Sequence, residues 1–430
     1  MVDRPIGCGI DFGTSNSAVS LAYRDRVDVV RVGDGLTASL PSVAFLHRDG
    51  GRRAGEEAAA RYYRQATERT SCADCALVEY GFSRCRHYHR DGGCADSRLV
   101  TGMKRDLGRV QGFATHSWAI DFTVADLATV VVGTLKRLAE REANGRLDRV
   151  VVGHPVVFPA AQGGDERAQE LAQLQLRRAA EQAGFDEIEF FPEPIAAVMD
   201  ETLAEGWVLS VDFGGGTYDV ALLRVESGRP EVVALGGTPV GGEQIDEALF
   251  ETRVAPALGI DQLPSWIVNE MRSLAGARQL LMDPGLPGVL QGIGTKAARV
   301  ASAILYGGAV FEFYRTLEGG KIALSSRPRV DVAFNRPGID LELSVTRQEL
   351  ESIVSPELDA VVEATRTTLA GAGVEAAEIG RVLRTGGSSR MPAFIARMGC
   401  LFPQAVLEER DAFTGVARGL GVRVRQRWAA

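Results

Sequence analysis

An aspartate followed by glycine, between two apolar runs, occurs at two places in the chain. Residues 208–223 read VLSVDFGGGTYDVALL, and residues 9–21 read GIDFGTSNSAVSL. Each pattern predicts two strands joined by a tight turn, because glycine accepts positive φ and lets a ligand approach the backbone closely. Backbone N–H groups of such turns bind phosphate oxygens, and a nearby carboxylate can hold the accompanying Mg²⁺. The sequence therefore predicts two phosphate loops, with Asp11 and Asp212 as their carboxylates.

The two stretches align with each other. Superimposing their Asp-Phe-Gly triplets pairs Asp11 with Asp212 and Val19 with Val220. A repeat at this long spacing indicates a duplicated domain whose two loops face each other across a cleft, although either stretch alone also fits an ordinary glycine-rich hairpin. The residues expected around the phosphates are Gly13, Thr14, Ser15 and Asn16 in the first loop and Gly214, Gly215, Gly216 and Thr217 in the second, followed by Asp219.

With this repeat, the sequence resembles the ATPase superfamily of actin, hexokinase and the DnaK-type heat-shock chaperones. The resemblance implies an α/β fold, the duplicated ribonuclease-H-like or actin-like ATPase fold, with two lobes and a nucleotide cleft between them. It places lobe I at residues 1–204 and lobe II at 205–410, with a helical subdomain at about 247–325. Residues 411–430 are expected to form a helix that returns to lobe I.

Size and composition agree with a multidomain globular protein. The chain has 430 residues, of which 45% are apolar and 24% are charged, and its net charge is −8. That charge argues against a nucleic-acid partner, and no apolar run is long enough to span a membrane. The first strand begins within about ten residues, which leaves no room for a secretory signal, so a cytoplasmic location is expected.

Four of the six cysteines lie close together in an insertion at residues 72–94. Cys72 and Cys75 are spaced to bind one tetrahedral metal ion. Cys85 and Cys94 follow, with His87 and His89 between them. Structural zinc is the favoured interpretation. A redox or iron–sulfur role and unconnected buried thiols are the alternatives, and a disulfide framework is not expected in the cytoplasm.

Two further segments match chaperone motifs that surround the γ-phosphate. Residues 101–108, TGMKRDLG, resemble the "K-R-x-x-G" segment, which implies that Lys104 reaches the γ-phosphate and the attacking water. Residues 190–197, FFPEPIAA, resemble "N-E-P-x-A-A", which makes Glu193 the carboxylate near the metal shell. The prolines on both sides predict that Glu193 is held in an extended turn. In relatives, a proline equivalent to Pro155 relays the nucleotide state through an arginine. The position of that arginine is occupied by Gly163 in this chain, which puts the relay in doubt, although Arg167 could substitute.

The remaining motifs belong to the nucleoside side of the expected site. Gly241 and Gly242 would close over the phosphates, and Asp246 lies on the helix that follows them. Glu318, Lys321 and Ser325 match "E-x-x-K-x-x-x-S", share one helix face and would surround ribose and adenine. Ile322 stands where many relatives stack an arginine on adenine. The adenosine loop "G-G-S-x-R-x-P" is represented by Gly386, Gly387, Ser388 and Arg390.

The order of these motifs favours the chaperone branch, and the resemblance implies slow, Mg²⁺-dependent ATP hydrolysis. A stand-alone bacterial form without the chaperones' peptide-binding domain is expected. Its implied role is a molecular switch that acts on a protein client or co-chaperone; a small-molecule phosphotransferase and an actin-like filament former are the alternatives. Asp11 and Asp212 would flank a hydrated Mg²⁺ while Asp219 tunes the metal shell. Thr14, Ser15 and Thr217 would hold the phosphates, and Lys104 and Glu193 would position water. Lys104→Ala or Asp212→Asn is expected to leave folding intact and to lower turnover at least ~10²-fold.

Overall fold

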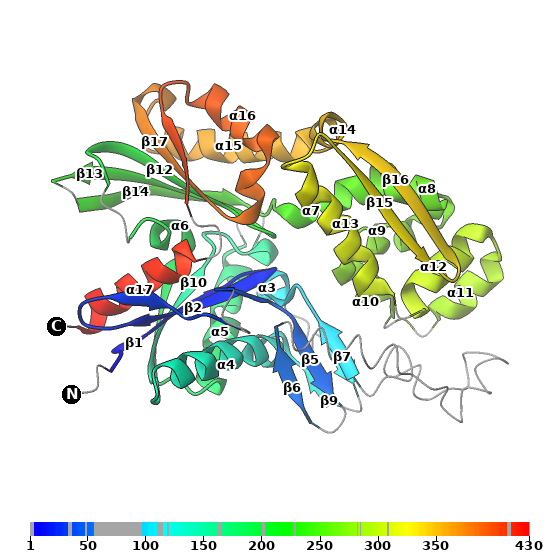
Figure 1. Ribbon diagram of the computed structural model, residues 1–430, viewed down its shortest axis with the longest axis horizontal. Coiled ribbons are helices and arrows are strands. Elements are labelled where there is room, and N and C mark those ends of the chain that lie inside the picture. The colour runs from blue at the N-terminus through cyan, green and yellow to red at the C-terminus, as the bar shows by residue number, and fades with distance from the viewer. Residues whose placement is uncertain are drawn as a thin grey trace.

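Two sheets with the same strand connections form the two halves of the protein (Figure 1). The computed structural model describes residues 4–32, 37–47, 50–55, 97–109, 115–117, 120–161, 165–199, 203–227, 229–281, 283, 285–307, 309–410 and 414–429. One sheet has the order β3-β2-β1-β10-β11, with β4 beside β2, and the other has the order β14-β13-β12-β17-β18. In both sheets the first three strands along this order pair antiparallel and the later ones pair parallel, so the predicted duplication is present.

The first sheet carries the first glycine turn between β1 and β2. Its strands are β1 (Gly7–Phe12), β2 (Asn16–Ala22), β3 (Val27–Val29), β4 (Leu40–Pro41), β10 (Arg149–His154) and β11 (Glu187–Pro192). A smaller sheet lies beside it and contains β5 (Ala44–His47), β6 (Arg52–Ala54) and β7 (Ser97–Val100), and a separate hairpin contains β8 (Thr115–Ser117) and β9 (Ile120–Phe122).

The second sheet carries the second glycine turn in the same place. Its strands are β12 (Gly206–Phe213), β13 (Tyr218–Glu226), β14 (Arg229–Thr238), β17 (Ile379–Thr385) and β18 (Val406–Glu409). Val19 pairs with the residue before Asp11, and Val220 pairs with the residue before Asp212. The structure therefore confirms the alignment of the two stretches, and each aspartate is the next-to-last residue of the inner strand of its hairpin.

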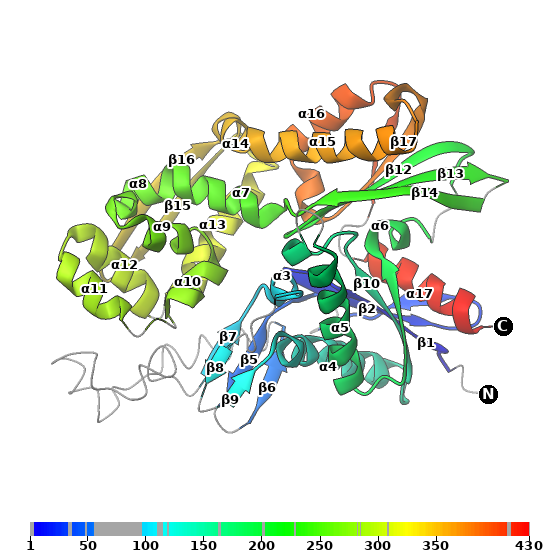
Figure 2. The same cartoon turned by 180° about the vertical axis from the view of Figure 1, so that it is seen from behind.

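Helices cover both faces of each sheet (Figure 2). In lobe I, α4 (Val124–Glu142) and α5 (Glu166–Gln182) pack on one face and α17 (Gly415–Trp428) packs on the other. In lobe II, α15 (Ser355–Gly371) and α16 (Pro392–Leu401) lie on the outer face, and the short α6 (Glu193–Ala196) contacts the inner one. Thr123 and Asp126 form a capping box that begins α4. Among the described residues, no helix combines the length and apolar character that a membrane crossing requires.

A mostly helical subdomain extends from lobe II beside the long hairpin β15–β16 (Figure 1). It contains α7 (Gly242–Leu249), the π-helical η4 (Phe250–Val254), α8 (Ala255–Leu258), η5 (Ile260–Gln262), α9 (Ser265–Met271), α10 (Leu274–Leu281), α11 (Leu286–Ile293), α12 (Lys296–Tyr306), α13 (Val310–Leu324), β15 (Arg329–Arg336), β16 (Ile339–Thr346) and α14 (Arg347–Ile353). The described part of the chain also contains the short elements α3 (Met103–Asp106), η3 (Pro159–Ala161), η6 (Ala376–Glu378) and η7 (Gly387–Arg390).

The helical subdomain touches lobe I through a small apolar cluster, which we call the lobe bridge. Val43, Phe45 and Leu99 of lobe I pack there with Leu274 and Phe311 of the helical subdomain. Beside the cluster, a guanidinium nitrogen of Arg278 donates a hydrogen bond to the Thr101 carbonyl at 3.0 Å. The two halves of the molecule are therefore held together at a point outside the main sheets.

Candidate functional site

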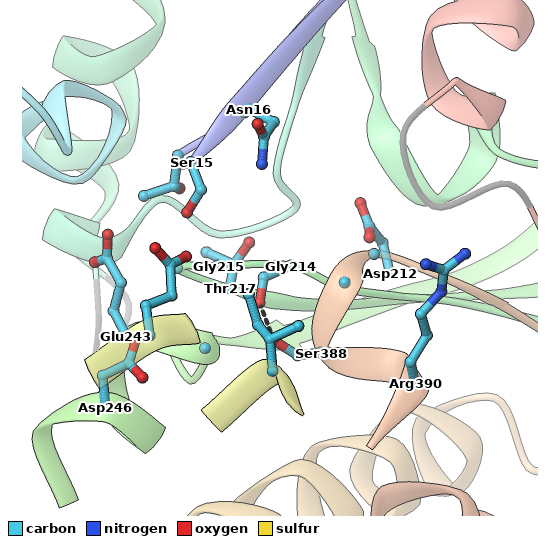
Figure 3. Close-up of a pocket in the computed structure, with 18 of the residues that line it drawn as sticks. Ser15, Asn16, Asp212, Gly214, Gly215, Thr217, Glu243, Asp246, Ser388 and Arg390 are labelled. Carbon is cyan, nitrogen blue, oxygen red and sulfur yellow. Dashed lines mark hydrogen bonds between the residues drawn. The ribbon is translucent and has the colours of Figure 1, made fainter. Parts of the chain in front are cut away.

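A cavity of about 250 Å³ lies between the two glycine turns (Figure 3). The residues that line it are Asp11, Gly13, Thr14, Ser15, Asn16, Lys104, Glu193, Asp212, Gly214, Gly215, Gly216, Thr217, Gly242, Glu243, Asp246, Glu318, Lys321, Ile322, Ser325, Gly386, Gly387, Ser388, Arg390 and Met391. The structure thus brings together, from segments more than 300 positions apart, every predicted nucleotide-site residue in the described part of the chain except Gly241 and Asp219.

The two glycine turns approach each other closely at the wall of this cavity. A Cβ atom added to Gly215 would lie 2.5 Å from the Ser15 hydroxyl, and one added to Gly216 would lie 2.8 Å from the Thr14 hydroxyl. Glycine at both positions therefore lets the second turn approach the hydroxyl residues of the first in the rotamers that they adopt here. This close approach forms a cradle lined by backbone and hydroxyl groups, which suits a phosphate chain.

Two other segments hold the second turn in place. At the start of α7, the N–H of Gly242 donates to the Gly214 carbonyl at 3.0 Å, and the N–H of Glu243 donates to the Gly215 carbonyl at 2.8 Å. The Ser388 hydroxyl also donates to the Gly214 carbonyl, at 2.8 Å (Figure 3). Gly241 lies directly under this turn, because an added Cβ would be 2.5 Å from the Gly215 carbonyl oxygen. Gly241 therefore supports the cavity wall from behind.

A buried ion pair joins Lys104 of α3 to Glu193 of α6. Lys104 Nζ lies 2.6 Å from Glu193 Oε1, and the two side chains are only 5% and 4% exposed. Burial alone would lower the pKa of Lys104, but the charges of Glu193 and Asp11 raise it overall, so the ammonium stays charged. The sequence prediction of an extended turn at Glu193 is wrong. Glu193 is the first residue of α6, since Pro194, which lacks an N–H, fits the first turn of a helix.

The carboxylates of the two turns share this environment. Burial and the charge of Glu193 raise the pKa of Asp11 well above its ordinary value, and Asp212 adds to the increase. The same two causes raise the pKa of Asp212 to about 6. Among the described residues, no three His, Cys, Asp or Glu side chains are arranged to hold a metal ion directly. Because Mg²⁺ usually keeps several of its water ligands, Asp11 and Asp212 fit an ion that is held through water.

A family model described as "Hsp70 protein" matches residues 7–257 and 309–424. The chain belongs to the Hsp70 family. It therefore has that family's actin-like two-lobed ATPase fold, and its nearly complete match covers both glycine turns. The unmatched range 258–308 contains the part of the helical subdomain from η5 to α12.

Curated relatives of this Hsp70-family chain carry the description "Chaperone protein HscA homolog". Those from Burkholderia mallei (strain SAVP1), Burkholderia pseudomallei (strain 668) and Burkholderia multivorans (strain ATCC 17616 / 249) are each 28% identical to it over 433 residues. The match covers 98% of this chain and 58% of each relative, so the chain spans little more than half their length.

Asp219 lies behind the cavity wall in this Hsp70-family site. Its Oδ1 atom accepts a hydrogen bond from the N–H of Val156 at 2.6 Å, which links β13 of lobe II to the segment after Pro155 in lobe I. Burial raises the pKa of Asp219 to about 8, with further contributions from Glu193 and Asp212. The relay from Pro155 stays in doubt and the substitution by Arg167 stays a prediction; Gly163 lies outside the described residues, and Arg167 is exposed.

The nucleoside side of the cavity is formed by α13 and the loop after β17. Glu318, Lys321 and Ser325 all face it, as their spacing predicts. Lys321 is already engaged, since Nζ donates to Asp246 Oδ2 at 2.7 Å and to the Gly242 carbonyl at 2.9 Å. Ile322 is 59% exposed and offers an apolar surface at the cavity. Arg390 donates to Glu409 at 2.7 Å, so its guanidinium is anchored beside the cavity.

Sequence reasoning did not assign a role to Arg105, which follows Lys104 in α3. Arg105 Nη1 lies 2.5 Å from Glu243 Oε2, and Nη2 lies 3.5 Å from Glu247 Oε1, both on α7. This pairing ties the Lys104 segment of lobe I to the helix that holds the second glycine turn. Arg105 belongs to the "K-R-x-x-G" match, but no local pattern in the sequence indicates its partner on α7. The predicted zinc ligands Cys72, Cys75, Cys85 and Cys94 lie outside the described residues, so nothing here supports a zinc site.

Proposed function

We propose that the chain binds ATP and ADP in this cavity, hydrolyses ATP slowly and acts as a molecular switch on a protein partner. The observation that carries the proposal is the meeting of the two duplicated glycine turns at one cavity that also contains the buried Lys104–Glu193 pair. Residues 1–204 and 205–410 would be the lobes that open and close, with 411–430 tying the end of the chain to lobe I. The chaperone description of the HscA relatives supports a protein client or co-chaperone as the partner.

The side chains around the cradle have distinct roles in this mechanism. Thr14, Ser15 and Thr217 would donate hydrogen bonds to the β- and γ-phosphates of the substrate. Lys104, kept charged by Glu193, would neutralise the γ-phosphate, and Glu193 would orient the attacking water. Because the transition state of phosphoryl transfer is loose, such positioning and charge neutralisation account for most of the catalysis.

The acidic residues would supply the metal environment. Asp11 and Asp212 line the cavity and would hold Mg²⁺ through its water ligands, while Asp219 supports this region from behind. When bound, Mg²⁺ would reduce the negative charge of the phosphate oxygens. We predict that turnover depends on Mg²⁺. We also predict that the protein is cytoplasmic.

The decisive experiment measures ADP and phosphate release from purified chain with Mg²⁺-ATP, first without and then with a panel of small-molecule acceptors. Steady release without an acceptor supports the switch. ATP consumption that depends on an acceptor would instead indicate a phosphotransferase of the same superfamily, and light scattering that rises only with nucleotide would indicate a filament former. If none of the three appears and calorimetry detects no nucleotide binding, the proposed function is wrong.

Gly387→Ala is expected to weaken nucleotide binding without changing stability. A Cβ at Gly387 meets no atom within 4 Å, yet the residue lines the cavity, so the added methyl group would point into space that the nucleoside needs. We expect ADP affinity to fall roughly tenfold, which corresponds to about 1.4 kcal/mol. Calorimetric titration checks the affinity and thermal unfolding checks the stability. Gly399→Ala in α16 is the matched control, since Gly399 also has open space but does not line the cavity. Equal ADP affinity in both variants would refute the placement of the adenosine loop.

Phe311→Ala is expected to accelerate ADP release by loosening the lobe bridge. Phe311 packs from α13 against Val43, Phe45 and Leu99 of lobe I. Phe311→Ala therefore removes buried apolar surface that stabilises the arrangement in which the two lobes are in contact. We expect dissociation of a fluorescent ADP analogue in stopped-flow measurements to become about tenfold faster, since a loss of roughly 1.4 kcal/mol corresponds to that factor. Trp266→Ala, at a 44% exposed position of the same subdomain, serves as the control. An unchanged release rate in Phe311→Ala would show that the bridge does not limit release.

A further inference from the structure

The backbone of Val156 lies between one side chain from each lobe. Its N–H donates a hydrogen bond to Asp219 Oδ1 at 2.6 Å, and its carbonyl accepts one from Gln169 Nε2 at 3.0 Å. Asp219 belongs to β13 of lobe II, whereas Gln169 belongs to α5 of lobe I. Val156 therefore forms a hydrogen-bonded connection from α5 to the second lobe.

Gln169 also binds the same segment at a second point. Its Oε1 atom accepts a hydrogen bond from the N–H of Phe158 at 3.0 Å. The segment lies between the end of β10 and the start of η3, and in the described part of the chain no backbone group bonds to the N–H or carbonyl of Val156 or to the N–H of Phe158. An amide side chain suits this position because it has both a donor and an acceptor, whereas an ionised carboxylate only accepts. Gln169 therefore fixes the backbone on both sides of residue 157.

The lobe II end of this connection lies next to the nucleotide cavity. Asp219 pairs directly with Asp212 across the β12–β13 hairpin, and Asp212 lines the cavity. Asp219 is only 1% exposed, so bulk water cannot replace a hydrogen bond that is lost there. The contact between Val156 and Asp219 consequently favours the arrangement in which the two lobes lie together around the cavity.

We propose that Gln169 is a positioning residue, which holds the Val156 N–H in line with Asp219 and thereby stabilises the contact between the lobes. Gln169 does not line the cavity, so it acts through Val156 and not on the nucleotide itself. The inference rests on the proposed nucleotide switch, because it assigns control of ADP release to a residue of α5. Weakening this connection shifts the lobes apart and accelerates release.

Gln169→Met and Gln169→Glu separate this role from simple anchoring of the segment. Methionine keeps the length of the side chain and removes both hydrogen bonds, whereas glutamate, ionised at pH 8, still accepts from Phe158 but cannot donate to Val156. Both variants should release a fluorescent ADP analogue about fivefold faster than wild type in stopped-flow measurements, the order expected for one hydrogen bond. Gln182→Met is the matched control, because Gln182 lies on the same helix but bonds to Thr129 of α4, within lobe I. A wild-type release rate in either Gln169 variant, or equal acceleration in Gln182→Met, would overturn the proposal.

A double-mutant cycle with Asp219→Ala tests whether Gln169 acts through Val156. Asp219→Ala removes the acceptor of the Val156 N–H, so in that background Gln169→Met should change the release rate less than about twofold. An undiminished effect would show that Gln169 acts by another route and would refute the proposal. Release of ADP needs no hydrolysis, so the cycle does not depend on the turnover of Asp219→Ala.

Hydrogen exchange of the Val156 amide tests the positioning without nucleotide. Phe158 is fully buried in the core of lobe I, so the segment is expected to stay folded in the Gln169 variants. Exchange should become about fivefold faster in Gln169→Met and stay unchanged in Gln182→Met. Unchanged exchange in Gln169→Met would contradict the positioning itself. Absence of ADP binding in wild type would instead refute the proposed function, and the exchange measurement would still decide the role of Gln169.

Discussion

Replacing Lys104 with methionine is expected to lower ATP turnover at least about 100-fold, as expected for the loss of one preorganised charged group at the reacting phosphate. Lys104 lines the cavity between the two glycine turns, and its charge is maintained by Glu193 and Asp11. Methionine keeps the length and packing of the side chain but cannot neutralise the γ-phosphate. Phosphate release at saturating ATP measures the effect, and ADP affinity should change far less than turnover.

Burial of the Lys104–Glu193 pair changes the expectation drawn from sequence that such a variant folds as wild type does. Removing one partner leaves a buried charge uncompensated, which typically costs about 3–5 kcal/mol. The double variant Lys104→Met, Glu193→Gln removes both charges and should recover most of that stability without recovering turnover. Lys136→Met is the matched control, because Lys136 is also buried in lobe I and paired with a glutamate, Glu140, but lies away from the cavity. Its stability should fall while its turnover persists.

Each result of this comparison is informative. If Lys136→Met loses as much turnover as Lys104→Met, the losses come from instability alone. If the double variant regains both stability and turnover, Lys104 has no catalytic role. The proposed mechanism requires that turnover is lost in both variants that lack Lys104, whatever their unfolding free energy, and persists in Lys136→Met.

The two glycine hairpins and one helix face could be predicted because their signals are local, whereas the meeting of the hairpins at one cavity was predicted from their repeat. Alternating apolar strands around Asp11–Gly13 and Asp212–Gly216 determine two hairpins, and glycine is needed wherever the turns approach each other as closely as Gly215 and Ser15. The helix face of Glu318, Lys321 and Ser325 follows from periodicity alone. Such features do not depend on how distant segments pack.

Features that depend on tertiary contacts were missed or misjudged. Glu193 was expected in an extended turn but begins α6, because α6 packs between the sheet of lobe II and α17. Asp219 follows the second turn and pairs with Asp212 across the hairpin, but its carboxylate accepts from the N–H of Val156 and does not line the cavity, which depends on how lobe I packs there. The pairing of Arg105 with Glu243 joins residues 138 positions apart, which no local pattern indicates.

Asp212→Asn is expected to lower turnover at least about 100-fold while making the nucleotide-free protein more stable, since removal of a charge-stabilising group typically costs ~10²–10³ in rate. Burial and Glu193 raise the pKa of Asp212 from 3.8 to about 6, so between these values the folded protein binds its proton more tightly than the unfolded chain does. The unfolding free energy therefore decreases as pH rises through this window, by up to about 3 kcal/mol for this group. Asparagine cannot ionise, so the variant should gain stability relative to wild type as pH rises from about 4 to about 7. Denaturant unfolding at several pH values, beside phosphate release at pH 7.5, measures both effects. An asparagine variant that is less stable than wild type at pH 7.5 would show that the carboxylate is held by favourable contacts instead, and one with full turnover would remove Asp212 from the mechanism.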